Sequence, residues 1–438
     1  MKPMEVAGTV RSVLITAALT ATAAFAEAQA PTGYGPNPEL PPPDTAHRAA
    51  RFVRGVGWPA GATPRARPGL RVALYADQLR NPRWIYVLPN GDVLVAESAN
   101  PGAASDSLLT PQELGARWGA RLRGISANRI TMLRDTTGDG LPDIRTVLLQ
   151  GLNRPFGMTL LRRSLYVANT DALRRYPYEA GQTRITAPGE KILDLPAGGY
   201  NNHWTRNVIP SPDGRKLYVT VGSATNADVE GIDARDPRRA AILEVNPDGS
   251  GMRVFASGLR NPNGLAWEPQ TGALWTAVNE RDGLGNDLVP DYVTSVREGA
   301  FYGWPYAYFG AHEDPRHRGR QPGLVARAVP PDYALGAHTA TMAIVFYQGT
   351  AFPARYRGGA FVSQRGSWNR GEFAGYRVLF LPFRDGRPSG AVEEFLTGFL
   401  VPGREEVFGR PVGLAVLRDG SLLVADDAGD RIWRVTAE

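Results

Sequence analysis

The residues of this chain that could do chemistry gather around one histidine and one Arg-Asn pair. His203 lies in the run NNHWTR over 201–206, and the pair is Arg260-Asn261. A neutral imidazole can act as a general base near pH 7, and a guanidinium makes fixed paired contacts to carboxylates. These residues indicate a site that accepts a proton and holds an anion. A hydrogen-bonded loop histidine and arginines exposed at turns are the alternatives.

Two oxygen-rich loops could hold a metal ion. The loop NERDGLGND over 279–287 offers carboxylates, amides and glycine-permitted backbone carbonyls, which suit calcium. An ordinary acidic turn is the alternative. The stretch DTTGDGLPD over 135–143 resembles the start of a calcium loop, but Thr146 stands where a bidentate glutamate would complete it, which favours a turn. The sequence contains no zinc-type His/Glu triad, nucleotide-binding glycine fingerprint or GxSxG nucleophile motif.

The composition excludes several classes of chemistry. The 438 residues include no cysteine, so disulfides, thiolate metal sites, a cysteine nucleophile and a covalently attached c-type haem are excluded. The formal net charge of +6 is spread along the chain without a basic run, which argues against nucleic acid and favours a small anionic ligand.

The N-terminus has the pattern of an export signal. Residues 1–30 combine Lys2 and Arg11 with an apolar run, Val13–Phe25, and small-residue cleavage sites. An uncleaved membrane anchor is the alternative, although the run is short for a bilayer span. Residues 31–69 are rich in Pro, Ala and Arg and are expected to form a tether. We therefore expect a periplasmic or secreted protein without stable membrane insertion.

A repeated pattern of turn, apolar strand, glycine turn and second strand predicts the fold. It occurs six times, with copies beginning at Asn81, Arg154, Arg206, Asn261, Phe352 and Arg410. Six such units without helical repeats predict an all-β protein, a six-bladed β-propeller over 70–438, with residues 70–77 closing the last blade. A β-sandwich or two smaller β-domains are the alternatives. Two insertions, 100–127 and 281–347, enlarge the first and fourth units, and one or two helical turns are expected within 112–121.

In shared order, six motifs resemble the soluble glucose/sorbosone dehydrogenase family, and most closely its sorbosone-dehydrogenase-like branch. They are HWTR from His203, GLRNP from Gly258, NERDG from Asn279, VPDY from Val289, GSWNR from Gly366 and GRPVG from Gly409. The family consists of six-bladed propellers that use pyrroloquinoline quinone and calcium. The resemblance covers most of the chain from Leu70 onward.

The resemblance implies roles for the site residues. His203 would be the catalytic base, and Arg260, also catalytic, would contact the quinone together with Asn261, Arg365 and Arg410. At two positions the chain departs from the family's residue pattern in a way that affects the expected binding of the cofactor. Arg365 stands where well-studied members carry lysine and where its own branch usually has histidine. Val412 stands where a second sixth-blade arginine is expected.

Further roles follow from the same resemblance. The carbonyls of Glu280 and Arg281, braced by Asp287, would hold the calcium ion. The substrate positions are Tyr302 and Trp304 as an aromatic wall, with Glu97 and Asn202 near it.

The resemblance thus implies an exported quinoprotein that oxidises a sugar or a related aldehyde or alcohol. Hydride would pass to pyrroloquinoline quinone, with calcium as the Lewis acid, and electrons would leave to an external quinone or cytochrome. The alternatives are a calcium-dependent propeller lactonase and a non-catalytic sugar-binding propeller. Added quinone and calcium distinguish these three functions by dye reduction, lactone opening or neither.

Overall fold

The computed structural model describes residues 1, 33–46, 50–102, 111–120, 122 and 124–438. The expected export signal falls almost entirely outside these residues. Among the described residues, no helix is both long and apolar enough to cross a bilayer.

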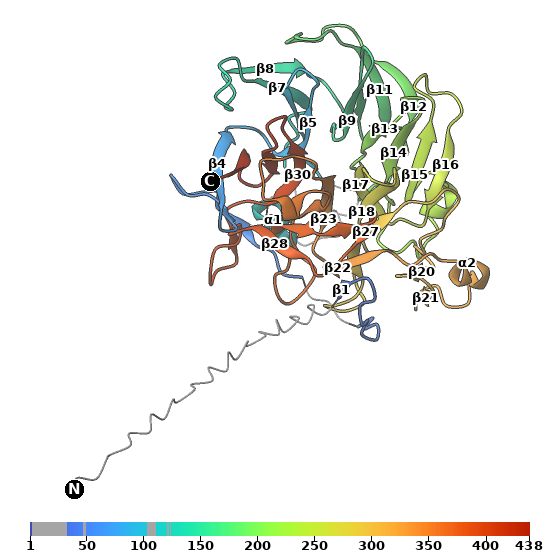
Figure 1. Ribbon diagram of the computed structural model, residues 1–438. Coiled ribbons are helices and arrows are strands. Elements are labelled where there is room, and N and C mark those ends of the chain that lie inside the picture. The colour runs from blue at the N-terminus through green and yellow to red at the C-terminus, as the bar shows by residue number, and fades with distance from the viewer. Residues whose placement is uncertain (2–32, 47–49, 103–110, 121, 123) are drawn as a thin grey trace. The chain divides into compact units, whose positions relative to one another are not determined.

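Six antiparallel sheets form the blades of a β-propeller (Figure 1). Blade 1 contains β5 (Pro82–Val87), β6 (Val93–Glu97), β7 (Arg129–Arg134) and β8 (Ile144–Leu149). Blade 2 contains β9 (Met158–Leu161), β10 (Ser164–Ala168), β11 (Ala172–Pro177) and β12 (Glu190–Asp194). Blade 3 contains β13 (Val208–Pro210), β14 (Leu217–Val221), β15 (Ala241–Val245) and β16 (Arg253–Ser257).

The remaining blades recruit strands from the N-terminal part of the chain. Blade 4 contains β17 (Asn261–Trp267), β18 (Leu274–Asn279), β19 (Pro290–Ser295) and β22 (Tyr333–Ala337), with β1 (Tyr34–Gly35) at its edge. Blade 5 contains β23 (Thr341–Phe346), β24 (Ala360–Gln364), β25 (Arg377–Leu381) and β28 (Glu393–Thr397), with β3 (Arg65–Ala66) at its edge. Blade 6 contains β30 (Pro411–Val416), β31 (Leu422–Asp426), β32 (Arg431–Ala437) and β4 (Leu70–Ala76).

The predicted six-bladed propeller and its closure are confirmed. The first strands of successive blades contact one another, as β30 does with β5 on one side and with β23 on the other. Strand β4 pairs antiparallel with the C-terminal strand β32, with Val72 opposite Val435 and Leu70 opposite Ala437. The second strands are buried along their whole length in four of the blades; β10 is buried except at its first residue and β18 except at its last. Alternating apolar strands therefore fill the spaces between blades.

Among the described residues, short two-stranded pairs and two α-helices lie outside the main sheets of the blades. They are β2 (Arg54–Gly55) with β29 (Glu406–Val407), β20 (Ala307–Tyr308) with β21 (His312–Glu313), β26 (Phe383–Arg384) with β27 (Arg387–Pro388), and the helices α1 (Pro111–Gly119) and α2 (Pro322–Ala326). Helix α1 lies in the 100–127 insertion, where helical turns were expected.

The fifth repeat begins earlier than its sequence pattern indicated. The pattern placed its start at Phe352, but the first strand of blade 5 is β23, and Pro353 lies between β23 and β24. No Arg-Pro or Asn-Pro turn precedes β23. Instead His338 and Ala340 turn the chain with positive φ angles of 61° and 54°. His338 therefore occupies the entrance position of its blade, which the sequence pattern had hidden.

The described part of the expected tether is built into the propeller. Residues 33–46 and 50–69 supply β1, β2 and β3. In the same segment, Trp58 donates from Nε1 to Asp426 Oδ2 at 2.6 Å and packs edge-on against Trp433 at 5.0 Å. This segment thus joins blades 4, 5 and 6 instead of spanning solvent.

Candidate active site

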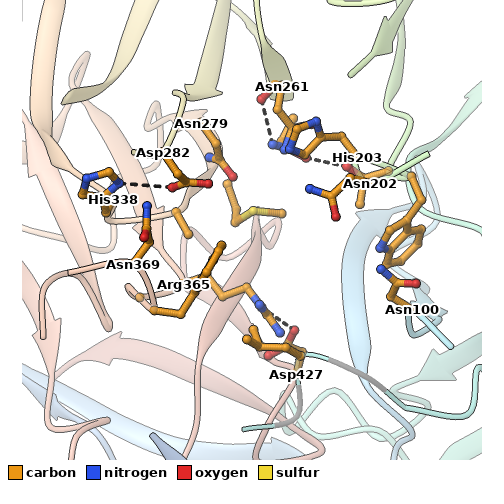
Figure 2. Close-up of a pocket in the computed structure, with 18 of the residues that line it drawn as sticks. Asn100, Asn202, His203, Asn261, Asn279, Asp282, His338, Arg365, Asn369 and Asp427 are labelled. Carbon is orange, nitrogen blue, oxygen red and sulfur yellow. Dashed lines mark hydrogen bonds and ion pairs between the residues drawn. The ribbon is translucent and has the colours of Figure 1, made fainter. Parts of the chain in front are cut away.

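One polar cavity of about 500 Å³ opens where the loops before the first strands meet the loops after the second strands. A first strand runs away from this mouth and the second strand returns to it, and loops of blades 1, 3, 4, 5 and 6 line the cavity. The lining is rich in asparagine side chains: Asn81, Asn100, Asn202, Asn226, Asn261, Asn263, Asn279 and Asn369. Figure 2 shows His203 and Asn261 on one side, Asp282 and His338 on another, and Arg365 with Asp427 on a third.

His203 is held in one tautomer by Ser223. Its Nδ1 lies 2.8 Å from both the carbonyl oxygen and the Oγ of Ser223. The Ser223 hydroxyl donates to Thr225 O at 2.7 Å, so both neighbours of Nδ1 are acceptors. Nδ1 therefore carries the proton, and Nε2 keeps a lone pair for accepting another proton. Burial, and then the charge of Arg260, lower the pKa of His203 well below 6.5, so the ring is neutral at pH 7.

A glycine allows the histidine and Asn261 to approach the same strand end. A Cβ at Gly222 would lie 2.5 Å from Asn261 Oδ1 and 2.7 Å from His203 Cβ. Both distances are shorter than real Cβ contacts, so only glycine fits between these side chains. The end of β14 therefore sets the distance between His203 and Asn261.

The N–H groups of the Arg260 guanidinium are used on the protein, in a set of contacts that we call the Arg260 clamp. Its guanidinium bonds Asn226 O at 3.1 Å, Asn226 Oδ1 at 2.8 Å, Asn279 O at 3.3 Å, Glu280 O at 2.6 Å and Asp282 Oδ2 at 3.4 Å. Five N–H groups thus face five oxygen acceptors. In this arrangement Arg260 holds the loop after β18 against the loop after β14, and it acts on the cavity through its charge.

Asp282 joins this clamp to His338. His338 Nδ1 lies 3.2 Å from Asp282 Oδ1, and its Nε2 lies 2.9 Å from Gly285 O. Both ring nitrogens face acceptors, which favours the doubly protonated ring; these contacts raise the pKa of His338 despite its burial. Burial opposes ionisation of Asp282, but His338 and Arg260 hold its pKa well below the usual range. This side of the cavity therefore carries an ion pair between His338 and Asp282, with Arg260 beside it.

Two further carboxyl groups at this wall have pKa values that are raised instead of lowered. Burial raises the pKa of Glu280 to about 8 and that of Asp291 to about 6. Asp291 accepts backbone N–H bonds from Glu280 at 2.8 Å and Thr341 at 3.0 Å. Glu280 is therefore largely neutral at pH 7, which adds to the positive balance of the cavity.

Six of the residues expected at the site line the cavity together. They are Asn202, His203, Arg260, Asn261, Glu280 and Arg365. The sequence motifs that predicted a base beside an Arg-Asn pair therefore correspond to one place in the structure.

The other expected site residues lie outside the cavity lining. Glu97 is fully buried and bonds Arg129 through both carboxylate oxygens at 2.8 Å. Tyr302 is buried and donates to Ser295 O at 2.6 Å, and Trp304 donates to Asn226 O at 3.0 Å behind the Arg260 clamp. Arg410 is buried beside the cavity. The residues expected to wall the substrate thus have structural partners instead.

Several groups of the expected calcium loop are engaged by protein partners. The carbonyl of Glu280 already accepts from Arg260 at 2.6 Å, and Arg281 pairs with Asp314. Asp287 is half-exposed and pairs with Arg370 at 3.0 Å. Across the described ranges, no group of three His, Cys, Asp or Glu side chains is placed to hold a metal. In the 135–143 loop, both Asp135 and Asp143 accept backbone N–H bonds, as in a turn.

A different aromatic wall lines the mouth. Trp368 faces the cavity and stacks on Phe52 with ring centroids 5.7 Å apart and planes 7° apart. The guanidinium of Arg117, from α1, lies 5.3 Å from the Trp368 ring. Arg51 donates its N–H to Trp368 O at 2.8 Å, which fixes the N-terminal segment here. The insertion helix and the expected tether therefore both help to build the mouth.

Several site residues were missed by sequence reasoning, although a signal for them existed. Polar residues follow the second strand in several copies: Ser98, Ser223 and Asp427, which were missed, occupy the same position as Glu280 and Arg365, which were predicted. Since second strands return to the mouth, this position predicts cavity residues. Asp282 and Asn369 lie inside the motifs already noted, and Arg83 directly follows the turn of the first copy.

The fold and the site define a six-bladed propeller with a neutral histidine and an excess of cationic side chains at its mouth. Residues 167–366 match the family model described as Glucose / Sorbosone dehydrogenase, and residues 324–438 match the one described as TrAA12-like. The resemblance to the soluble glucose/sorbosone dehydrogenase family is thereby confirmed.

The chain is also similar to individual proteins. An uncharacterized protein of Borreliella burgdorferi is 29% identical over 299 residues, which cover 66% of this chain and 76% of that protein. Aldose sugar dehydrogenase YliI of Escherichia coli is 28% identical over 195 residues, 40% of this chain and half of that protein. The PQQ domain of pyranose dehydrogenase from Coprinopsis cinerea, solved in its holo form, superimposes with a TM-score of 0.69 at 20% identity, over 88% of this chain and 100% of that domain. At that identity, the superposition shows a shared fold.

Proposed function

We propose that this protein is an exported dehydrogenase that oxidises a sugar, or a related aldehyde or alcohol, with pyrroloquinoline quinone as its cofactor. The observation that carries the proposal is the joint placement of a neutral histidine and several cationic side chains around one cavity. The sugar dehydrogenases among the relatives support the substrate class and the cofactor.

The residues present fit an anionic quinone. In the part of the chain that the structure describes, the donors Nε and Nη1 of Arg410 are buried without hydrogen-bond partners. Buried polar atoms are normally satisfied, so unpartnered ones beside a cavity indicate a missing ligand. When bound, the quinone supplies the acceptor for a hydride. Arg365 and Asn261 would hold it at this wall, and Arg410 would add charge from behind.

His203 would take the proton of the substrate hydroxyl at Nε2. Its Nδ1–H stays on Ser223, so the ring keeps its orientation as it becomes charged. Burial, and then the charge of Arg260, keep the ring neutral before the reaction, and Arg260 holds the 279–282 loop in place. Trp368 and Phe52 would exclude water from one side of the mouth. A positioned base of this kind contributes roughly 10²- to 10⁴-fold to a rate.

The lining also fits a polyhydroxylated substrate. Asparagine amides donate and accept hydrogen bonds at once, as adjacent sugar hydroxyls require. Asn226 and Asn263 already use both ends of their amides on protein partners. Others from different blades, such as Asn100 and Asn202, labelled at one side in Figure 2, would supply such pairs. The proposal therefore specifies a sugar-sized polyol or aldose without naming it.

Calcium enters the proposal only together with the quinone. The loop carbonyls of Glu280 and Arg281 leave most of a six- to eight-oxygen shell unfilled. Quinone oxygens and water would have to complete it. Electrons would then leave to an external acceptor, since the chain has no cysteine for a covalent c-type haem.

The proposal is tested by reconstitution. Purified protein is supplied with pyrroloquinoline quinone and calcium, and reduction of a soluble dye is followed over a panel of aldoses and polyols. Substrate-dependent dye reduction is expected. Lactone opening without dye reduction, or sugar binding without turnover, would replace the proposal with one of the two alternative functions.

The variant His203→Ala tests the assigned base. Turnover should fall by roughly two to four orders of magnitude, because no nearby group replaces Nε2. The quinone affinity, measured by titration of protein fluorescence, should stay near that of the wild type. Near-normal turnover in quinone-saturated His203→Ala protein contradicts the role of His203.

A further inference from the structure

Two arginines, from blades 5 and 1, donate to one carboxylate on the cavity wall, and a third arginine, from blade 6, lies next to it. Arg365, after β24, donates from Nε to Asp427 Oδ2 at 2.7 Å, and Arg83, on β5, donates to the same oxygen from Nη1. The third, Arg410, lies next to Asp427, whose backbone N–H donates to Arg410 O at 3.1 Å. Arg83, Arg365 and Asp427 line the cavity directly.

This cluster carries an excess of positive charge and unsatisfied donors. Although burial opposes it, the neighbouring Arg365 and Arg83 hold the pKa of Asp427 below its usual range, so one carboxylate faces three guanidinium groups. Burial lowers the pKa of Arg83 to about 10, which still leaves it charged. Of the residues described, the donors Arg83 Nε and Arg410 Nε and Nη1 are buried without partners. Such donors are stabilised by an anion with several acceptor oxygens.

Arg83 lies where blade 6 lacks a basic residue. Val412, at the position where the resemblance implies a second arginine, is fully buried among apolar side chains. The neighbouring strand is β5, since a Cβ at Gly413 would lie 2.8 Å from Arg83 O. The guanidinium of Arg83 is positioned 5.4 Å from the Trp204 ring and 5.8 Å from the Phe156 ring. A side chain from blade 1 thus supplies the charge that Val412 does not.

We propose that Arg83 anchors a carboxylate of the bound cofactor and takes over, from blade 1, the role of the missing sixth-blade arginine. The identity of the ligand as a tricarboxylate quinone rests on the proposed function. The existence of a cavity wall that binds polycarboxylates does not rest on the proposed function.

The test compares two ligands on four proteins. Pyrroloquinoline quinone and benzene-1,3,5-tricarboxylate are titrated into wild type, Arg83→Gln, Arg83→Lys and Arg154→Gln, with binding followed by calorimetry and folding by circular dichroism. Arg154 is the matched control, because its guanidinium lies 5.8 Å from the same Trp204 ring but does not line the cavity. Arg83→Gln should weaken both ligands roughly 10- to 100-fold, as for a lost charged hydrogen bond. Arg83→Lys should weaken them several-fold, and Arg154→Gln should bind like the wild type.

The outcomes separate this inference from the proposed function. Wild-type binding of the tricarboxylate but not of the quinone supports the anchoring wall and contradicts the proposed cofactor. Folded Arg83→Gln protein that binds both ligands like the wild type overturns the role of Arg83 and leaves the proposed function intact. If Arg83→Gln does not fold, the lysine variant decides: it keeps the charge without the planar fork, and unchanged binding in it overturns the inference.

Discussion

At the scale of single residues, the chemistry of the site depends on one tautomer. Two acceptor atoms of Ser223 surround Nδ1 of His203, so the proton resides there and Nε2 faces the reaction. Burial, and then the charge of Arg260, keep the same ring neutral. The residue that positions the base, Ser223, and the residue whose charge adds to the shift, Arg260, are therefore different, and each can be tested separately.

The pH dependence of the reaction should reflect the lowered pKa of His203. A general base works in its neutral form, and its pKa in the folded protein lies well below 6.5. Activity should therefore persist as the pH falls through 6.5 and decline only at lower pH. The measurement is kcat/KM for the reconstituted protein from pH 4 to 8. An acid limb centred at or above pH 6.5 would contradict this assignment.

The glycine at 222 should be essential for activity, although it has no side chain. Gly222→Ala would displace His203 or Asn261, because the added Cβ overlaps both. A displacement of about 1 Å in a catalytic geometry can cost about 100-fold in rate, so kcat should fall by a factor of ten to a hundred. The control is Gly198→Ala, where no atom lies within 4 Å of the added Cβ. Equal rates for the two variants would show that the close approach has no catalytic role.

At the scale of elements, the loop between β18 and β19 is the part that ties the cavity together. It is held to the loop after β14 by Arg260 and by Asn226, whose Oδ1 accepts from Asp282 N at 2.9 Å. It is held to the entrance of blade 5 by the contact between Asp282 and His338. An acidic, glycine-rich loop that resembles a metal loop is thus cross-linked mainly by cationic side chains.

This arrangement predicts how calcium should act. Calcium alone should leave the thermal midpoint of the quinone-free protein unchanged, since the described loop offers no ready ligand set. Calcium should increase quinone affinity when both are present, because the quinone would complete the shell. Asp287→Ala should not alter either result, as Asp287 pairs with Arg370 at the surface. Stabilisation by calcium alone that is lost in Asp287→Ala would instead establish a preformed metal site.

At the scale of the whole molecule, the described N-terminal segment, residues 33–46 and 50–69, holds blades together. It adds an edge strand to blade 4 and another to blade 5, and its Trp58 shares Asp426 Oδ2 with Trp433 of blade 6, whose Nε1 lies 3.1 Å from that oxygen. The ring of blades is therefore closed both by the pairing of β4 with β32 and by a buried aromatic contact. Phe52 of the same segment also supports the cavity wall, which couples closure to the site.

Removing the main buried contact of this segment should destabilise the propeller strongly. Trp58→Ala deletes a buried indole and leaves Asp426 short of a donor, which should lower the free energy of unfolding by about 3–5 kcal/mol. Trp118→Ala, on the exposed face of α1, should change it by less than about 0.5 kcal/mol. Urea unfolding followed by fluorescence measures both. A decrease in the free energy of unfolding below about 1 kcal/mol for Trp58→Ala would mean that the segment contributes little to the stability of the propeller.

The sequence by itself determined the propeller and much of its active centre. Period-two alternation and recurring turns are local properties, so they located β5, β17 and β30 and the closing strand β4. The local runs around His203 and Arg260-Asn261 also predicted that a base and an Arg-Asn pair share one mouth, because entrance loops of a propeller converge.

Only the tertiary structure decided which partners these side chains have. Glu97 carries a carboxylate suited to a substrate site, but Arg129 neutralises it inside blade 1. Arg83 looks like one more turn arginine, but the pairing of β5 beside Val412 and Gly413 brings it to Asp427. Both outcomes depend on contacts between residues far apart in the chain, and hydrogen-bond and charge complementarity at such contacts arises only when blades pack. A residue's type and spacing therefore predicted what it can do, and its packing determined whether it faces the cavity.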